Sequence, residues 1–290
     1  MVSITKKQIG NETYYYLGHT YRSNGKVNKT EKYLGKEIPK NIEQLKKDFI
    51  FEIYKEKWFK IFEKIKENYK KDQKLMPISA KEKELETFMI KFTYDTQRIE
   101  GSKLTLKDTA NLLERGITPR EKPIRDIKEA ENHKQAFLYM KQQLKGDISK
   151  EFILELHRLL KNTVTEDAGK LRTGQGRVGT LIPIHAKLLE TELDNLLEWY
   201  HNNKKDLHPL ETASEFHSVF ERLHPFFDGN GRVGRLLLNY ILLKNKYPLL
   251  IVQNKNKRRY YTALKKADDG NILPMLKYLL FELQEQTKNW

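Results

Sequence analysis

The sequence predicts a mostly α protein that begins with a small antiparallel β module. Apolar residues recur at helical spacing over most of the 290 residues. The first forty residues differ, with an aromatic, β-prone run and an Asn-Gly turn. A glycine-rich interruption over residues 165–184 does not fit a helix. We expect a β module over residues 1–42, a connecting helix over 43–80 and a helical domain over 81–290.

The N-terminal module is expected to hold about three strands. Residues 14–17, Tyr-Tyr-Tyr-Leu, form one, Asn24-Gly25 is a hairpin turn, and residues 32–35 form another before Pro39. Basic and aromatic sheet faces can bind nucleic acid. The alternative is that these aromatic residues fill a small core of their own or dock the module onto the main domain.

Helical spacing continues from residue 41 to residue 72, and a break is expected at Lys70–Lys74. Helices are expected to begin at the segment Asp147-Ile148-Ser149 and at Pro209. Further helices are expected over residues 80–99, 105–115, 124–144, 149–161, 186–202, 209–222, 231–245, 257–268 and 271–287.

Composition limits the class of protein. Lys and Arg number 54 against 39 Asp and Glu, a net charge of +15, which suits nucleic acid or an acidic partner. The alternative is that basic residues are spread over every solvent-exposed face, because the lysines are interspersed with glutamates. No apolar stretch is long enough for a membrane span. The absence of cysteine excludes disulfides and a thiol nucleophile. We expect a cytoplasmic protein.

The most informative run is residues 224–235, His-Pro-Phe-Phe-Asp-Gly-Asn-Gly-Arg-Val-Gly-Arg. The apolar run over residues 236–243 follows, so the loop opens a buried helix whose first amides can bind an anion. Gly229 and Gly231 allow a phosphate to approach the backbone closely. Asp228 suits Mg²⁺. The alternative is a capped turn before a core helix.

This run resembles the signature of the Fic family, His-Pro-Phe-x-(Asp/Glu)-Gly-Asn-Gly-Arg-x-x-Arg, at every fixed position. The resemblance covers roughly residues 85–285. It implies a Fic-type helical bundle with a β-hairpin flap, and a Mg²⁺-dependent nucleotidyltransferase. The expected reaction moves AMP from ATP to a Ser, Thr or Tyr hydroxyl of a target protein.

The resemblance also assigns roles by residue. His224 is the general base that takes the proton of the hydroxyl, and Asp228 holds Mg²⁺. The Gly229-Asn230-Gly231 turn, with the Asn230 side chain, holds phosphates. Arg232 steadies the β-phosphate and Arg235 holds the γ-phosphate of ATP.

A second motif precedes the first. Residues 96–101, Thr-Gln-Arg-Ile-Glu-Gly, are similar to the family's inhibitory motif, (Ser/Thr)-x-x-x-Glu-(Gly/Asn). This places an inhibitory helix at about residues 85–101 and implies that Glu100 pairs with Arg235. ATP would then bind with its α-phosphate misaligned. The alternative is a helix end capped by Gly101 with Glu100 in solvent.

Two further segments are similar to family features. Within residues 165–184, Thr180, Leu181 and Ile182 would form the flap that aligns the target, and Arg172 precedes it. The alternative is a surface loop. Tyr261, or its neighbour Tyr260, would contact the adenine, although core packing is an equal explanation for one of them.

Several alternatives stay open on the sequence. Glu100 could position water for removal of AMP, alone or beside transfer. The chain could instead be a nucleic-acid-binding regulator, in which the N-terminal module dominates and the nucleotide site acts as a sensor. UTP or GTP could replace ATP. The target is not identified, and a homodimer is one of the assemblies that the resemblance allows.

Overall fold

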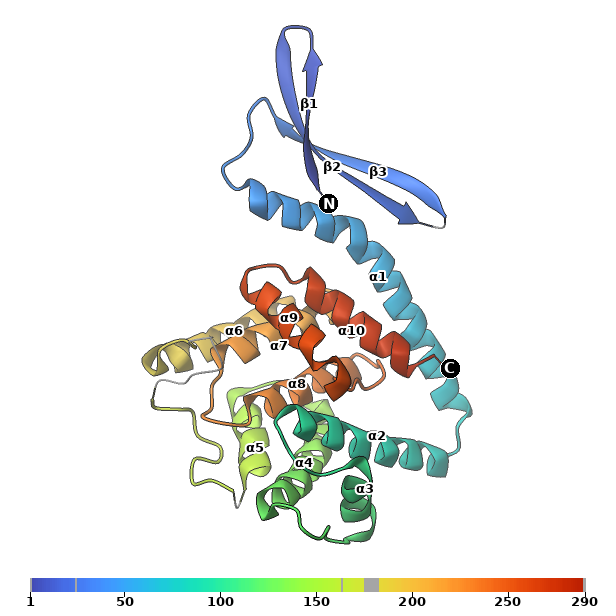
Figure 1. The fold of residues 1–290 in the computed structure, drawn as a ribbon, viewed down its shortest axis with the longest axis vertical. Helices are drawn as coiled ribbons and strands as arrows, with labels where there is room; N and C mark the ends of the chain where they lie inside the picture. The colour runs from blue at the N-terminus through green and yellow to red at the C-terminus, as the bar shows by residue number, and fades with distance from the viewer. Residues whose placement is uncertain (1, 24, 163, 175–182, 289–290) are drawn as a thin grey trace. The chain divides into compact units, whose positions relative to one another are not determined.

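The computed structural model describes residues 2–23, 25–162, 164–174 and 183–288 (Figure 1). It is mostly helical with one small antiparallel sheet, which confirms the predicted fold class. Contacts within the chain divide it into two compact units, Met1–Ile61 and Phe62–Trp290. Helix α1 (Ile42–Leu75) runs through the boundary, so the first part of the predicted connecting helix groups with the sheet.

The N-terminal unit holds strands β1 (Ser3–Ile9), β2 (Glu12–Ser23) and β3 (Lys26–Gly35), in the order β1-β2-β3. Both neighbouring pairs are antiparallel, as the predicted meander requires. The two turns contain Gly10 and Gly25, which have positive φ angles of 63° and 76°. Glycine adopts this conformation at no steric cost.

One face of this sheet lies against α1. His19 Nε2 is 3.1 Å from the hydroxyl of Tyr54, and the Tyr54 ring lies 6.0 Å from that of Tyr21. Tyr54 also stacks on Trp58, at 5.5 Å between centroids. Leu17, on the same face by strand alternation, is fully buried. This part of the module therefore has a small aromatic core of its own.

The second unit contains the remaining helices, and the predicted helical pattern is confirmed with ends that differ by a few residues. The predicted break at Lys70–Lys74 is wrong, because α1 continues to Leu75 and the next helix begins after Pro77. The helices are α2 (Ile78–Ile99), α3 (Leu106–Arg115), α4 (Ile124–Gln142), α5 (Lys150–Lys161), α6 (Leu189–Asn203), α7 (Pro209–Leu223), α8 (Asn230–Lys244), α9 (Lys257–Asp268) and α10 (Leu273–Gln286).

Helix α8 forms the centre of this unit. It contacts α2, α4, α5 and α7, and its residues from Leu236 to Leu238 and from Tyr240 to Leu242 are fully buried. A helix that is apolar on all sides must be surrounded by other helices. The start of α8 therefore lies among helices that can bring side chains to it.

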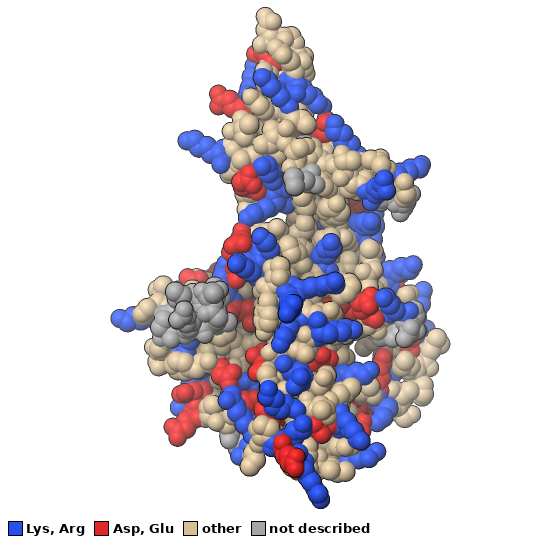
Figure 2. Space-filling model, viewed as in Figure 1, with Lys and Arg blue, Asp and Glu red and all other residues tan. Residues whose placement is uncertain are grey.

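Charged side chains show no single basic block on the visible face. Figure 2 shows Lys and Arg scattered among Asp and Glu over both units. In the described part of the chain, no helix has both the length and the apolar character needed to cross a bilayer.

Candidate active site

The loop between α7 and α8 is shaped by its own residues. His224 follows α7 in the left-handed conformation, with φ 48° and ψ 61°, and Gly229 precedes α8 with φ 87°. The side-chain amide of Asn230 accepts a hydrogen bond from the Phe226 N–H and donates one to the Phe226 carbonyl, both at 2.8 Å. The Asn230 side chain therefore closes the loop, and its amide is occupied where phosphate contact was predicted. Phe226 is fully buried.

Arg172 holds the loop from the other side. Its Nε donates to the His224 carbonyl at 2.8 Å, and its backbone N–H donates to Pro225 at 2.9 Å. The same guanidinium donates to the carbonyls of Gly174 and Ile184. Arg172 is 2% exposed. It thus fixes the backbone of His224 and both ends of the segment between Gly174 and Ile184.

The predicted flap residues Thr180, Leu181 and Ile182 lie outside the described residues.

His157 supports the loop from α5. Its ring stacks on Phe226, with centroids 3.7 Å apart, and its Nδ1 accepts a hydrogen bond from the Gly169 N–H. Its Nε2 can then donate to the Asp228 carbonyl, 3.0 Å away. Burial lowers the pKa of His157 to about 4, so the ring is neutral at pH 7 and keeps this tautomer.

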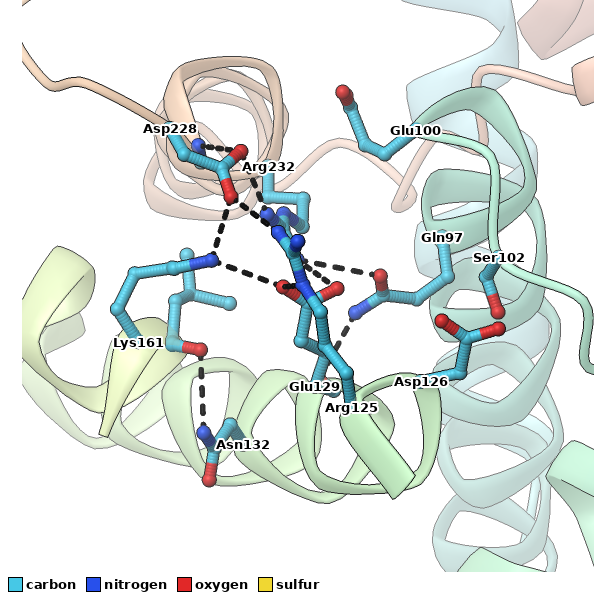
Figure 3. A network of polar contacts seen from close by, with 12 residues as sticks. Gln97, Glu100, Ser102, Arg125, Asp126, Glu129, Asn132, Lys161, Asp228 and Arg232 are labelled. Atoms are coloured by element: carbon cyan, nitrogen blue, oxygen red, sulfur yellow. Dashed lines mark hydrogen bonds and ion pairs between the residues drawn. The ribbon is translucent and has the colours of Figure 1, made fainter. Parts of the chain in front are cut away.

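Asp228 lies in a network of alternating charges at the start of α8 (Figure 3). Its Oδ2 is 2.7 Å from Lys161 Nζ and 2.8 Å from Arg125, and its Oδ1 is 3.1 Å from Arg232. Glu129 of α4 receives Lys161 at 2.9 Å and Arg232 at 2.8 Å. The Arg232 guanidinium, predicted at the β-phosphate, thus already has two carboxylate partners.

The network keeps its carboxylates ionised. Burial alone would raise the pKa of Asp228, but Arg232 and Lys161 outweigh it and hold that pKa well below its usual range. The same two cations lower the pKa of Glu129 against the effect of burial. Lys161 and Arg232 are each 1% exposed and Glu129 is 6% exposed, so the ion pairs that Glu129 makes with these two cations are shielded from solvent and salt.

Asp228 is a reasonable ligand for a hard cation, because 40% of its side chain is exposed. Among the described residues, no group of three His, Cys, Asp or Glu side chains could hold a metal ion. A single carboxylate still fits Mg²⁺, which usually takes its other ligands from phosphates and water. Any such ion must compete with Arg125 and Lys161 for Oδ2.

Arg235 is held by the end of α2. Its guanidinium lies 2.6 Å from Glu100 Oε1 and also bonds the Thr96 hydroxyl. Arg235 is 1% exposed, whereas the Glu100 side chain is 30% exposed. Gly231 leaves room for this pair, because a Cβ there would lie 2.6 Å from Glu100 Oε1 and 2.9 Å from Arg235 and would displace the two side-chain ends. The structure thus brings together the two residues that the second motif was predicted to pair.

The first amides of α8 face this region without helical partners. Residues 230–232 have no preceding turn whose carbonyls could accept their N–H groups. Their partial positive charge, with Arg232 and Arg235 close by, makes this helix start a place where an anion is stabilised.

His224 is suited to accept a proton at neutral pH. Burial lowers its pKa below the ordinary 6.5, the Glu221 carbonyl acts in the opposite direction, and the positive charge of Arg172 lowers it further. The imidazole is therefore neutral at pH 7.

Tyr260 and Tyr261 differ in how much of each side chain is exposed. Tyr260 is 1% exposed, and its hydroxyl is 2.8 Å from His217 Nε2. Tyr261 is 49% exposed and can reach a ligand. His217 also contacts the Gly234 carbonyl through Nδ1, so both ring nitrogens of this core histidine have partners.

Sequence reasoning missed Lys161, Glu129 and Arg125. One signal was present for two of them: Lys161 lies on the apolar face of α5, four residues after His157, and Glu129 lies on the buried face of α4. Charged residues on an apolar face need a partner. Their positions alone do not say which partner.

The comparisons place this geometry in a family. A model described as Fic/DOC family matches residues 147–242, which include the whole loop. Protein adenylyltransferase fic-1 of Caenorhabditis elegans is 32% identical over 200 residues, 67% of this chain. This chain belongs to the Fic/DOC family. It spans about two fifths of the length of the curated relatives it matches, 39% for the C. elegans protein.

Solved structures agree with the Fic assignment. Residues 134–508 of C. elegans Fic-1 give a TM-score of 0.74 at 26% identity, covering 86% of this chain and 76% of that one. A Fic domain containing signaling protein from Bacteroides thetaiotaomicron also gives 0.74, at 25% identity, covering 79% and 95%. The Fic fold therefore accounts for the arrangement of the helices around α8.

Proposed function

We propose that the chain is a protein adenylyltransferase, which transfers AMP from ATP to a Ser, Thr or Tyr hydroxyl of a target protein. The observation that carries the proposal is the placement of His224 at one end of a short, rigid loop and of the α8 amides at the other. The names of the relatives, protein adenylyltransferases, support the same chemistry.

In this reaction the target hydroxyl attacks the α-phosphorus of ATP, and its proton passes to His224. The bond from that phosphorus to the bridging oxygen of the β-phosphate breaks, and pyrophosphate leaves. The start of α8 and its arginines stabilise the charge on the phosphates. Mg²⁺ held by Asp228 would neutralise the phosphate charge further. Tyr261 is proposed to contact the adenine.

We assign an inhibitory role to Glu100. It occupies the guanidinium of Arg235, which would otherwise bind the γ-phosphate. An arginine–phosphate contact is worth about 1.5–3 kcal/mol, or roughly ten- to a hundredfold in occupancy of the productive pose. Removing the Glu100 carboxylate should therefore release activity.

The test uses ATP labelled at the α-phosphate, with Mg²⁺, and compares wild type with Glu100→Gly for self-labelling and for labelling of proteins in a lysate. The Glu100→Gly variant should label more strongly. His224→Ala in the same background should abolish transfer but keep ATP binding within a few-fold, because the imidazole contacts the acceptor. Persistence of transfer in the His224→Ala variant would exclude this mechanism.

The same experiment separates transfer from removal of AMP. If Glu100→Gly lowers the release of AMP from a labelled target and leaves transfer unchanged, Glu100 positions water. If transfer rises, Glu100 inhibits. Replacing labelled ATP by labelled UTP or GTP tests the donor.

A further inference from the structure

One face of the N-terminal sheet carries three tyrosine rings. Tyr14 and Tyr16 lie on the same face of β2 by strand alternation, and Tyr33 of β3 is the cross-strand partner of Tyr16. The Tyr33 ring centroid lies 6.1 Å from that of Tyr14 and 5.3 Å from that of Tyr16. Tyr33 is 53% exposed. We call this face of the sheet, which carries Tyr14, Tyr16 and Tyr33, the tyrosine face.

The tyrosine face is opposite to the face that lies against α1. In the described part of this unit, the ring contacts of α1 with the sheet involve His19 and Tyr21, whose side chains alternate with those of Tyr14 and Tyr16. The small core of the module is therefore formed without the three rings. Another role has to account for a cluster in which Tyr33 is exposed and Tyr14 and Tyr16 are partly buried.

Basic side chains lie beside the rings, and one carboxylate lies among them: Glu12 accepts a hydrogen bond from the Tyr14 hydroxyl and pairs with Lys36. Lys7 Nζ lies 4.4 Å from the Tyr16 ring centroid, and Lys36 Nζ lies 6.0 Å from that of Tyr14. Arg22 and Lys29 share this face by their register on β2 and β3. Over residues 3–35 the chain has six Lys and Arg against two Asp and Glu, which leaves a net charge of +4.

Glu31 arranges two of these cations. Its carboxylate pairs with Lys7 and with Lys29, the latter at 2.8 Å. The hydrogen bonds from both lysines hold the pKa of Glu31 at about 2, so the carboxylate is ionised at neutral pH. It places the two ammonium groups beside the rings and competes with any other anion for them.

We propose that the tyrosine face binds single-stranded nucleic acid, with bases stacked on its rings and phosphates at its basic side chains. An exposed ring beside two partly buried rings and cations fits unpaired bases, because every base has a planar face and follows a charged backbone. A duplex keeps its bases stacked inside. An acidic peptide would use the lysines and leave the rings without partners. Charge complementarity and the rings together favour a single strand.

The test measures fluorescence anisotropy of a labelled oligothymidylate of about twelve nucleotides with the full chain over a range of salt concentrations. The Kd should rise steeply with salt. Tyr33→Ala should weaken binding at least about fivefold, since stacking contributes about 1–3 kcal/mol per base. Tyr33→Phe keeps the ring and should bind as wild type, which separates stacking from loss of fold.

Two lysines of β3 provide a matched pair. Lys29 lies on the tyrosine face and Lys32 on the opposite face, and both are exposed. Lys29→Gln should weaken binding and reduce the slope of log K against log salt by about 0.7. Lys32→Gln should change neither. Glu31→Gln should tighten binding, because it frees two ammonium groups for phosphate.

Three results would overturn the proposal. The first is no binding even at low salt. The second is binding that Tyr33→Ala leaves unchanged. The third is equally tight binding of a duplex of the same length or of polyglutamate, which would mean attraction of any polyanion to the lysines.

Discussion

At the residue scale, Oδ2 of Asp228 is held by two cations of different accessibility. Lys161 is buried, whereas the Arg125 side chain is 61% exposed, and both contact the same carboxylate oxygen. An exposed ion pair contributes about 0.2–1 kcal/mol, so Arg125 is the partner that a divalent ion can displace at small cost. Lys161, which also bonds the buried Glu129, stays in place.

This distinction gives a first prediction. Arg125→Gln should lower the Mg²⁺ concentration required for half-maximal ATP binding by up to about fivefold, because one competing cation is removed. Calorimetric titration of ATP at several Mg²⁺ concentrations measures it. Lys128→Gln is the control, since Lys128 is exposed and lines the same surface pocket as Arg125 and Asp228. A higher Mg²⁺ requirement in the Arg125→Gln variant would contradict the prediction.

A second prediction concerns His224. Its pKa lies below 6.5 in the folded protein, so the neutral base persists at pH 6.5 and is lost as the pH falls through the lowered pKa. The kcat/KM for AMP transfer by the Glu100→Gly variant should therefore be more than half-maximal at pH 6.5. Labelled transfer measured from pH 5 to pH 8 tests this. An acid limb centred above pH 6.5 would be inconsistent with the burial of the imidazole.

At the scale of elements, α2 and α8 are joined through one guanidinium. Thr96 and Glu100 lie one turn apart on α2 and both bond Arg235 of α8. Without Glu100, the buried Arg235 loses its ion pair and retains only a weaker electrostatic attraction to Glu221, so the loss is costly. A triphosphate can replace that carboxylate.

The third prediction follows from this replacement. Glu100→Gly should lower the melting temperature without nucleotide and show a larger rise on addition of Mg²⁺ and ATP than wild type, because the bound phosphate supplies the lost charge. Arg235→Ala should not release activity, and the double variant should behave as Arg235→Ala alone. Thermal unfolding and labelled transfer measure both. Equal ATP-induced shifts in wild type and Glu100→Gly would argue against competition for Arg235.

The sequence was sufficient to predict the features that depend on the spacing of residues along the chain. Periodicity predicted the helices around α8, and the two motifs predicted that Glu100 and Arg235 face each other. It could not predict that Lys161 of α5 pairs with Glu129 of α4, because the packing of the two helices decides which charges meet. It also did not predict that the Asn230 side chain bonds the backbone of its own loop at Phe226.

At the scale of the whole molecule, the residues of the candidate active site and those of the tyrosine face lie in different units. Every side chain assigned to the candidate active site lies between residues 96 and 261, and the tyrosine face lies before residue 37. The part of the C. elegans relative that this chain matches is 39% of that protein's length.

The fourth prediction is that deleting residues 2–40 in the Glu100→Gly background leaves a folded protein with AMP transfer within a few-fold of the full chain. The reason is that the deletion removes no residue of the site and spares α1. Circular dichroism and labelled transfer are the measurements. A truncated protein that is insoluble or inert would show that the module completes the core.

The pairing of Lys161 with Glu129 has a consequence for how the sequence can evolve. Removing one partner of a buried ion pair costs about 3–5 kcal/mol, a large part of the roughly 5–15 kcal/mol that stabilises a typical protein. Replacing both by apolar residues costs less than replacing one, because Arg232 and Asp228, which also contact this pair, still pair with each other. Substitutions at these two positions should therefore arise together along a lineage, and an alignment of close relatives should show the two positions varying as a pair although 32 residues separate them.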